Sequence, residues 1–126
     1  MIIVDSCGWM HYFMNGDLAE QYVPYLSKFD HIMTPTIVLY EVYKKIRTEF
    51  GEEHAFLAAS QIEKTQLIPL SSSLACHAAD ISIEHKISMA DAIIYATANS
   101  HQATLVTSDA DFKGLPNVSY ISSSVS

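Results

Sequence analysis

The feature that most limits how this chain can fold is a series of short apolar runs separated by stretches with helical periodicity. The first run, Ile2-Ile3-Val4, is wholly apolar and β-branched, as is typical of strands buried on both faces of a parallel sheet. Similar runs occupy residues 31–34, 66–69 and 104–107, and a weaker one occupies residues 118–121. Strands that alternate with helices predict an α/β domain with a mainly parallel sheet.

The segments between these runs carry helix signals. Asp17, with Glu20 three residues later, predicts a capped helix that begins at Leu18. Thr36 is expected to cap the next helix, which Gly51 ends. The apolar stripe predicted for that helix consists of Leu39, Val42, Tyr43, Ile46 and Phe50. Residues 52–63 form a further predicted helix in the same connection.

Two more helices are predicted in the second half of the chain. Ser72 or Ser73 is expected to open a helix that runs to about His85. Ser88 is expected to open the last long helix, which spans residues 89–100 and carries several alanines. The 126 residues suit one domain, predicted over residues 1–121, followed by a frayed serine-rich tail at 122–126.

Composition and charge narrow the class of protein. Acidic residues outnumber basic ones 14 to 7, for a formal charge of −7, so a nucleic-acid ligand would need a bound cation or a local basic stretch. The two cysteines, Cys7 and Cys76, form no metal-binding or disulfide pattern and are expected to be reduced. No apolar run is long enough for a membrane helix and the opening is unlike a signal peptide, which predicts a cytoplasmic protein with no membrane partner.

Acidic residues fall where such a sheet would bind a ligand. Open parallel sheets bind ligands at the carboxyl ends of their strands. Asp5 ends the first run, Asp109 lies two residues beyond the fourth, and Asp91 lies in the first turn of a predicted helix. Glu41 lies inside the helix that follows the second run. Clustered carboxylates repel one another unless a cation neutralises them, and oxygen ligands alone favour Mg²⁺ or Mn²⁺.

Each acid also has a purely structural interpretation. Asp5 could cap a helix that begins at Ser6 or Cys7, and Asp91 could complete a capping box with Ser88. Glu41 precedes Lys45 by four residues, which suits a surface ion pair. Asp109 and Asp111 could be ordinary turn residues. The spacing alone therefore supports an acidic metal site without identifying its reaction.

Four segments together resemble the PIN-domain family of nucleases, and in particular the stand-alone VapC-type toxins of toxin–antitoxin pairs. The segments are Ile3-Val4-Asp5-Ser6-Cys7-Gly8-Trp9, Thr34-Pro35-Thr36-Ile37-Val38-Leu39-Tyr40-Glu41-Val42, Ile87-Ser88-Met89-Ala90-Asp91-Ala92-Ile93-Ile94-Tyr95-Ala96-Thr97-Ala98, and Leu105-Val106-Thr107-Ser108-Asp109-Ala110-Asp111-Phe112. Each motif is weak alone, but four in this order over nearly the whole chain are specific. Cys7 stands where the family often has a small polar residue.

The resemblance implies a three-layer α/β/α fold with a central, mainly parallel sheet, and Mg²⁺- or Mn²⁺-dependent cleavage of RNA. It implies that Asp5, Glu41, Asp91 and Asp109 form the catalytic set. Within that set, Asp5 and Asp91 are expected to be the main metal ligands, Asp109 to complete the shell or bind a second ion, and Glu41 to orient the attacking water or act as the base. The resemblance also implies a homodimer and a small antitoxin partner.

Further residues are candidates for supporting roles. Ser6 and Thr107 carry hydroxyls beside the acids and could orient a carboxylate or touch a phosphate. Asp111 is a weaker ligand candidate. Lys44, Lys45 and Arg47 place three of the seven basic residues within one helical turn, where they could hold phosphates near Glu41 or simply form a solvated helix face.

Two other kinds of enzyme on a similar sheet need residues that this chain lacks. A receiver domain would need paired acids after the first strand, and a haloacid-dehalogenase phosphatase would need an Asp at position 7, where this chain has Cys7. A PIN-domain nuclease that processes RNA without being a toxin remains an alternative, as does a binding module that has lost catalysis. The compact length favours the toxin, and the complete acidic set favours the enzyme.

Overall fold

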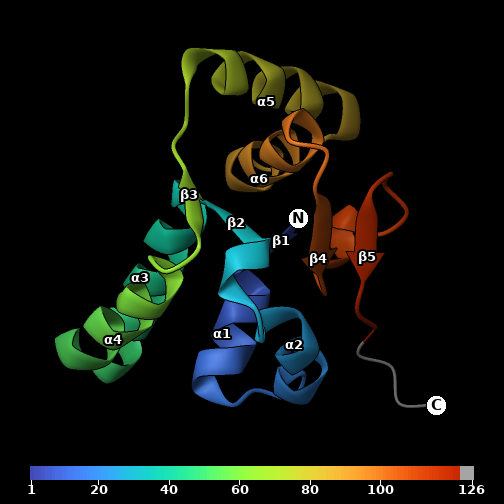
Figure 1. Ribbon diagram of the computed structural model, residues 1–126. Helices are drawn as coiled ribbons and strands as arrows, with labels where there is room; N and C mark the ends of the chain where they lie inside the picture. Colours follow the sequence, from blue (N-terminus) through green and yellow to red (C-terminus); the bar gives the residue numbers. More distant parts are fainter. Residues whose placement is uncertain (123–126) are drawn as a thin grey trace.

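A computed structural model of the protein describes residues 1–122, so most of the predicted tail, residues 123–126, lies outside the described part. The centre of the fold is a sheet of five parallel strands in the order β3-β2-β1-β4-β5 (Figure 1). Their bounds are β1 Ile2–Val4, β2 Ile32–Pro35, β3 Gln66–Ile68, β4 Thr104–Thr107 and β5 Val118–Tyr120. All five predicted strands and their parallel arrangement are confirmed, with ends that differ from the prediction by one residue at most.

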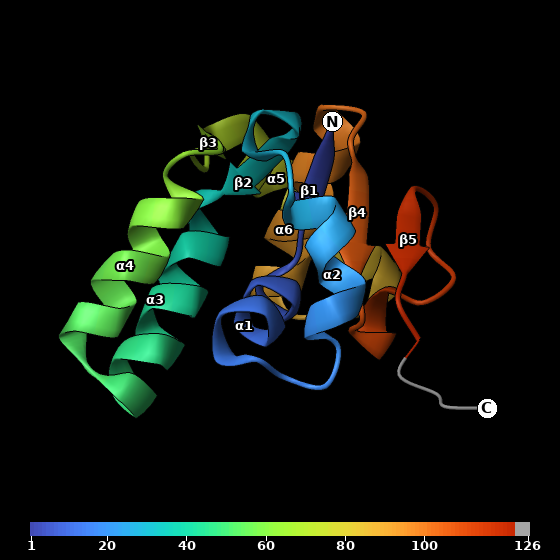
Figure 2. The ribbon, with the colours of Figure 1, turned by 60° about the horizontal axis from the view of Figure 1, so that its bottom comes forward.

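Helices cover both faces of this sheet. Their bounds are α1 Ser6–Met14, α2 Ala19–Leu26, α3 Thr36–Phe50, α4 Glu52–Ile62, α5 Ser72–His85 and α6 Met89–Ser100, with short 3-10 turns η1 Phe29–His31 and η2 Ala110–Phe112. The pair α5 and α6 covers one face, whereas α1 to α4 lie on the other (Figures 1 and 2). The predicted three-layer α/β/α arrangement is therefore confirmed.

The core explains why these segments fold as they do. The β-branched and apolar strand residues Ile3, Val4, Leu105 and Val106 are fully buried, as expected for central strands covered on both faces. Helix α6 is buried along the whole stretch from residue 92 to residue 98, since it lies between the sheet and α5. Its alanines let it lie close to the strands. No helix within residues 1–122 has both the length and the apolarity needed to cross a membrane.

Two predicted helix caps are wrong. Asp17 does not cap α2, which begins at Ala19 after a Leu18 N-cap without a side-chain hydrogen bond; a turn from Gly16 leads into this helix instead. Thr36 is already the first residue of α3, because β2 runs directly into that helix. Helix α5 begins at Ser72 and ends at His85, as predicted, and Ser71 before it accepts the Leu74 N–H at 3.2 Å. The predicted Ser88 cap of α6 is confirmed, with the Asp91 N–H as donor.

The predicted stripe of α3 is only partly right. The fully packed positions are Val38, Val42 and Ile46, four residues apart. Phe50, predicted as part of the stripe, is 51% exposed. The reason is that α3 and α4 extend beyond the sheet as a helical hairpin (Figure 2), so the last turn of α3 has no sheet to pack against.

Candidate active site

The candidate site lies at the carboxyl ends of β1 and β4. These neighbours are paired so that Val4 faces Val106, and the Asp5 N–H donates to the Val106 carbonyl at 3.0 Å. The chain runs from β1 outward to β2 and β3, then returns to the other side of β1 as β4. Such a reversal of strand order opens a crevice at the carboxyl edge, which is where open α/β sheets bind ligands.

Asp5 forms the floor of this site. Its carboxylate is 2% exposed and accepts hydrogen bonds from Ser6 N–H to Oδ1 and from Thr107 Oγ1 to Oδ2, both at 2.8 Å. The structural interpretation therefore also holds, because Asp5 is the N-cap of α1. Burial raises the pKa of Asp5 above its usual range, and the charge of Asp109 adds to this, while the bonds from Thr107, Ser6 and Cys7 oppose it.

The loop after β4 folds back toward helix α6. Thr107 Oγ1 accepts the Asp109 N–H at 2.9 Å, and Asp109 Oδ1 accepts the Asp111 N–H at 2.9 Å, which begins the turn η2. As a result, carboxylate oxygens of Asp91, Asp109 and Asp111 all lie within 4.8 Å of one another. Asp111, which the sequence presented as a weaker candidate, thus belongs to this cluster together with Asp91 and Asp109.

Burial and neighbouring charge perturb Asp91 strongly. Burial raises the pKa of Asp91 to about 7, with further contributions from the negative charges of Asp109, Asp5 and Asp111. Asp5 lies apart from the tight group of three, but its charge reaches both Asp91 and Glu41. A bound cation would relieve this repulsion, whereas the protein alone leaves it in place.

Glu41 faces the acidic cluster rather than Lys45. The ion pair suggested by the spacing is wrong, because Lys45 Nζ pairs with Glu49 Oε1 at 2.7 Å, one turn further along α3. Burial raises the pKa of Glu41, a hydrogen bond from Ser6 lowers it, and the charges of Asp5 and Asp109 raise it further. Within the described residues, the buried Oε1 of Glu41 has no hydrogen-bond partner.

These side chains fit a hard divalent cation. Among residues 1–122, the ion pairs of the protein involve none of the acids of the cluster, so no basic side chain neutralises them. Their donor atoms are all carboxylate oxygens, which suit Mg²⁺ or Mn²⁺. The residues that could hold such an ion are Asp5, Asp91, Asp109 and Asp111, with the unpaired Oε1 of Glu41 beside them.

A partly buried polar network behind Asp5 was not foreseen from the sequence. Cys7 Sγ lies 3.4 Å from Asp5 Oδ2, 3.6 Å from the Tyr22 hydroxyl and 3.5 Å from Ser108 Oγ. Tyr22, from α2, donates to Ser108 Oγ at 2.8 Å. The sequence drew attention to Cys7, two residues after Asp5, but did not predict its contacts. Tyr22 gave no signal, since nothing in the sequence places α2 against this loop.

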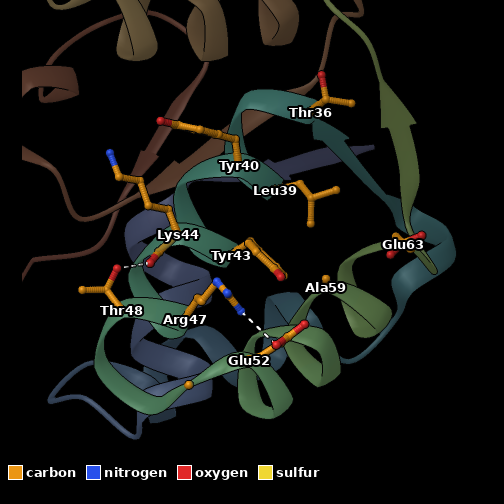
Figure 3. A pocket seen from close by; sticks show the side chains of 11 residues that line it. Thr36, Leu39, Tyr40, Tyr43, Lys44, Arg47, Thr48, Glu52, Ala59 and Glu63 are labelled. Carbon is orange, nitrogen blue, oxygen red and sulfur yellow. Dashed lines mark hydrogen bonds and ion pairs between the residues drawn. The ribbon is translucent and has the colours of Figure 1, made fainter.

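The three basic residues of α3 have different surroundings. Arg47 lies 3.4 Å from Glu52 and faces a groove of about 990 Å³ between α3 and α4 (Figure 3). Lys45 is held by Glu49. Lys44 lies over the Tyr40 ring, 5.7 Å from its centroid, and makes no ion pair within the described part of the chain. Lys44 and Lys45 both line a smaller hollow that reaches Glu41.

Solved structures with the same fold come from toxin–antitoxin systems. A toxin–antitoxin complex from Klebsiella pneumoniae contains a chain 24% identical to this one, with a TM-score of 0.79 over 94% of this chain and 96% of that chain. VapC20 of Mycobacterium tuberculosis, described as a toxin that cleaves the sarcin–ricin loop, is 22% identical, with a TM-score of 0.70 over 82% and 85% of the two chains. VapBC2 of Rickettsia felis, crystallised with a DNA fragment from its promoter, is 21% identical, with a TM-score of 0.73 over 96% of this chain and 98% of that chain.

At these identities the likeness shows a shared fold. No curated protein matches the sequence closely enough to count as a relative. The family itself is shown by the sequence, because residues 2–118 match the PIN domain. The match includes β1 and Asp5, α3 and Glu41, α6 and Asp91, and the loop that carries Asp109 and Asp111. The chain therefore belongs to the PIN-domain family of nucleases.

Proposed function

We propose that this protein is a Mg²⁺- or Mn²⁺-dependent endoribonuclease and the toxin of a type II toxin–antitoxin system. The observation that carries the proposal is the meeting of carboxylates from β1, α3, α6 and the β4 loop at one edge of the sheet, with no basic side chain among residues 1–122 paired to them. A cluster of this kind is stable when it binds a cation, and a cation there suits a phosphodiester substrate.

Asp5, Asp91 and Asp109 are the proposed metal ligands, with Asp111 able to complete the set. When bound, the metal polarises a phosphoryl oxygen and lowers the pKa of water. Thr107 and Ser6 fix the Asp5 carboxylate through its two oxygens, so the floor of the site is rigid before substrate arrives. Glu41 presents an unpaired oxygen beside the cluster and accepts the proton of the attacking water.

The structural neighbours support the choice of RNA and of a toxin role. One neighbour is described as cleaving the sarcin–ricin loop, and others were solved with their antitoxins. By analogy, we propose a small antitoxin protein as partner, a homodimer as assembly, and the cytoplasm as location. These are analogies of fold, and the function is tested at the site itself.

The test is cleavage of total cellular RNA by purified protein. We expect discrete fragments with Mg²⁺ or Mn²⁺ and intact RNA with EDTA; intact RNA with every metal tried would exclude the nuclease. Growth arrest on expression, relieved by the product of the adjacent small open reading frame, is expected of a toxin. Cleavage without growth arrest would instead favour the alternative PIN-domain nuclease that processes RNA.

A further inference from the structure

A hollow of about 340 Å³ opens directly beside Glu41. Besides Glu41, its walls are Tyr40, Lys44, Lys45, Thr48 and Glu49 of α3, together with Met10 of α1. Because Glu41 is itself part of the wall, whatever occupies the hollow lies next to the carboxylate cluster. The hollow is therefore placed to receive the part of a substrate that flanks the reacting phosphate.

Two side chains of this hollow, Tyr40 and Lys44, contribute little to the folded core and are available to bind a ligand. Tyr40 is 58% exposed, so its ring contributes little to the core. Lys44 lies over that ring and has no carboxylate partner within the described residues, unlike Lys45 and Arg47. Figure 3 shows Tyr40 and Lys44 projecting in the same direction, which differs from that of Tyr43 and Arg47, although all four residues line the α3–α4 groove.

We propose that Tyr40 and Lys44 form a nucleotide subsite, in which an unpaired RNA base stacks on the Tyr40 ring and a neighbouring phosphate binds the Lys44 ammonium. The inference rests on the proposed RNA cleavage and names where the strand lies. Aromatic faces combined with basic side chains are what proteins use to bind single-stranded nucleic acid. In a chain of net charge −7, the Lys44 ammonium, which has no ion pair among residues 1–122, also offsets local repulsion of the phosphates.

RNA fits this hollow better than a protein segment does. An apolar peptide would bury the Lys44 ammonium without a partner, which is unfavourable. A phosphate supplies the missing negative charge, and the exposed Tyr40 ring accepts any base by stacking. Because Glu41 lines the hollow, a nucleotide bound there lies within the cleavage region.

The test measures RNA binding separately from cleavage. The RNA is a fluorescently labelled single-stranded oligonucleotide that the wild type cuts. Protein carrying Asp5→Asn, which should bind RNA without cutting it, is added to this RNA, and binding is followed by fluorescence anisotropy. In this background we expect Tyr40→Ala to raise Kd about tenfold, in line with the loss of one stacked base. Tyr40→Phe keeps the ring and should bind like the parent. Lys44→Gln should weaken binding and reduce the slope of log K against log salt concentration by about 0.7, the value for one phosphate contact to a single strand.

Matched controls come from α4. Phe56→Ala removes an aromatic ring that is 65% exposed, and Lys64→Gln removes an exposed ammonium just beyond that helix; neither should change Kd. Unchanged binding by both Tyr40→Ala and Lys44→Gln, with wild type that still cuts RNA, overturns the subsite and leaves the nuclease standing. Wild type that neither cuts nor binds RNA overturns both. Normal RNA binding together with lost binding of the co-expressed product of the adjacent reading frame would assign this surface to a protein instead.

Discussion

The hydroxyl of Thr107 joins two acids of the candidate site, since Oγ1 donates to Asp5 Oδ2 at 2.8 Å and accepts the Asp109 N–H at 2.9 Å. Thr107 is fully buried, so water cannot replace this hydroxyl if it is removed. We predict that Thr107→Val weakens Mg²⁺ binding by about 10- to 100-fold, the usual effect of losing a group that orients a metal ligand. Isothermal titration calorimetry with Mg²⁺ measures this directly.

Thr107→Ser is the matched control, because it keeps the hydroxyl and removes only a methyl group. It should bind Mg²⁺ like the wild type despite a small loss of stability from the missing methyl. Equal Mg²⁺ affinity for the Val and Ser variants would show that the hydroxyl does not organise the metal site.

Glu41 and Glu49 lie two turns apart on α3 but have different surroundings. Glu41→Gln should reduce RNA cleavage by about 10²- to 10⁴-fold, as expected for loss of a catalytic base, without lowering the melting temperature of the metal-free protein. Glu49→Gln removes an acid outside the cluster and breaks its exposed pair with Lys45, a contact of about 0.3–0.5 kcal/mol, so cleavage should stay close to that of the wild type. The comparison is made by cleavage rates and thermal melts, and equal activity of the two variants would argue against a role for Glu41.

Gly8 allows Tyr22 to reach the site. A Cβ atom at position 8 would lie 2.4 Å from Tyr22 Cε1 and 2.7 Å from Val4 Cγ1, in a region where all three residues are buried. We therefore predict that Gly8→Ala lowers the free energy of unfolding by about 1–3 kcal/mol through overpacking. Urea denaturation measures the sign of this change in the free energy of unfolding. The sign is decisive, because Gly→Ala within an unobstructed helix would instead raise the free energy of unfolding by about 1 kcal/mol.

The acidic cluster gives the metal-free protein a characteristic pH dependence. Burial and neighbouring acids raise the pKa of Asp91 from 3.8 to about 7, so folding favours its protonated form. The contribution of Asp91 to the free energy of unfolding is fully present at low pH and is lost as the pH rises through about 7. The raised pKa values of Asp5 and Glu41 act in the same direction.

Mg²⁺ requires ionised carboxylates and should reverse this loss. We expect the increase in melting temperature on adding Mg²⁺ to be small at about pH 5.5 and large at about pH 8. Asp91→Asn should make this increase smaller and less dependent on pH. A Mg²⁺ effect of equal size at both pH values in the wild type would contradict the arrangement of carboxylates described above.

Local patterns were sufficient to predict the sheet. The apolar runs identified the inner strands β1, β2 and β4 because strands covered on both faces are apolar, whereas the outer strand β5 is only half-buried and gave a weaker signal. The acids at strand ends could be placed at one edge because parallel strands share their carboxyl ends. The position of Asp111 could not be foreseen, since it depends on the turn η2, where Asp109 Oδ1 accepts the Asp111 N–H.

The sequence could not predict contacts that depend on how the helices pack. Lys45 has an acid four residues away in both directions, Glu41 and Glu49, and only the packing of α3 decides that it pairs with Glu49. Tyr22 reaches Ser108 across 86 residues of sequence, and this contact depends on how α2 lies against the β4 loop. Asp17 carried a good capping signal, but its effect was lost because the turn at Gly16 sets the start of α2.

The central claim, that Asp5 and its neighbouring carboxylates cut RNA with a metal, is tested most directly by the single-turnover cleavage rate of Asp5→Asn in Mg²⁺. Asparagine can still cap α1, so the fold should persist, and Asp17→Asn, at an exposed acid with no capping role, is the matched control. We predict that Asp5→Asn melts like the wild type yet cuts RNA at least about 100-fold more slowly, while Asp17→Asn cuts normally. Wild-type cleavage by folded Asp5→Asn would contradict the account.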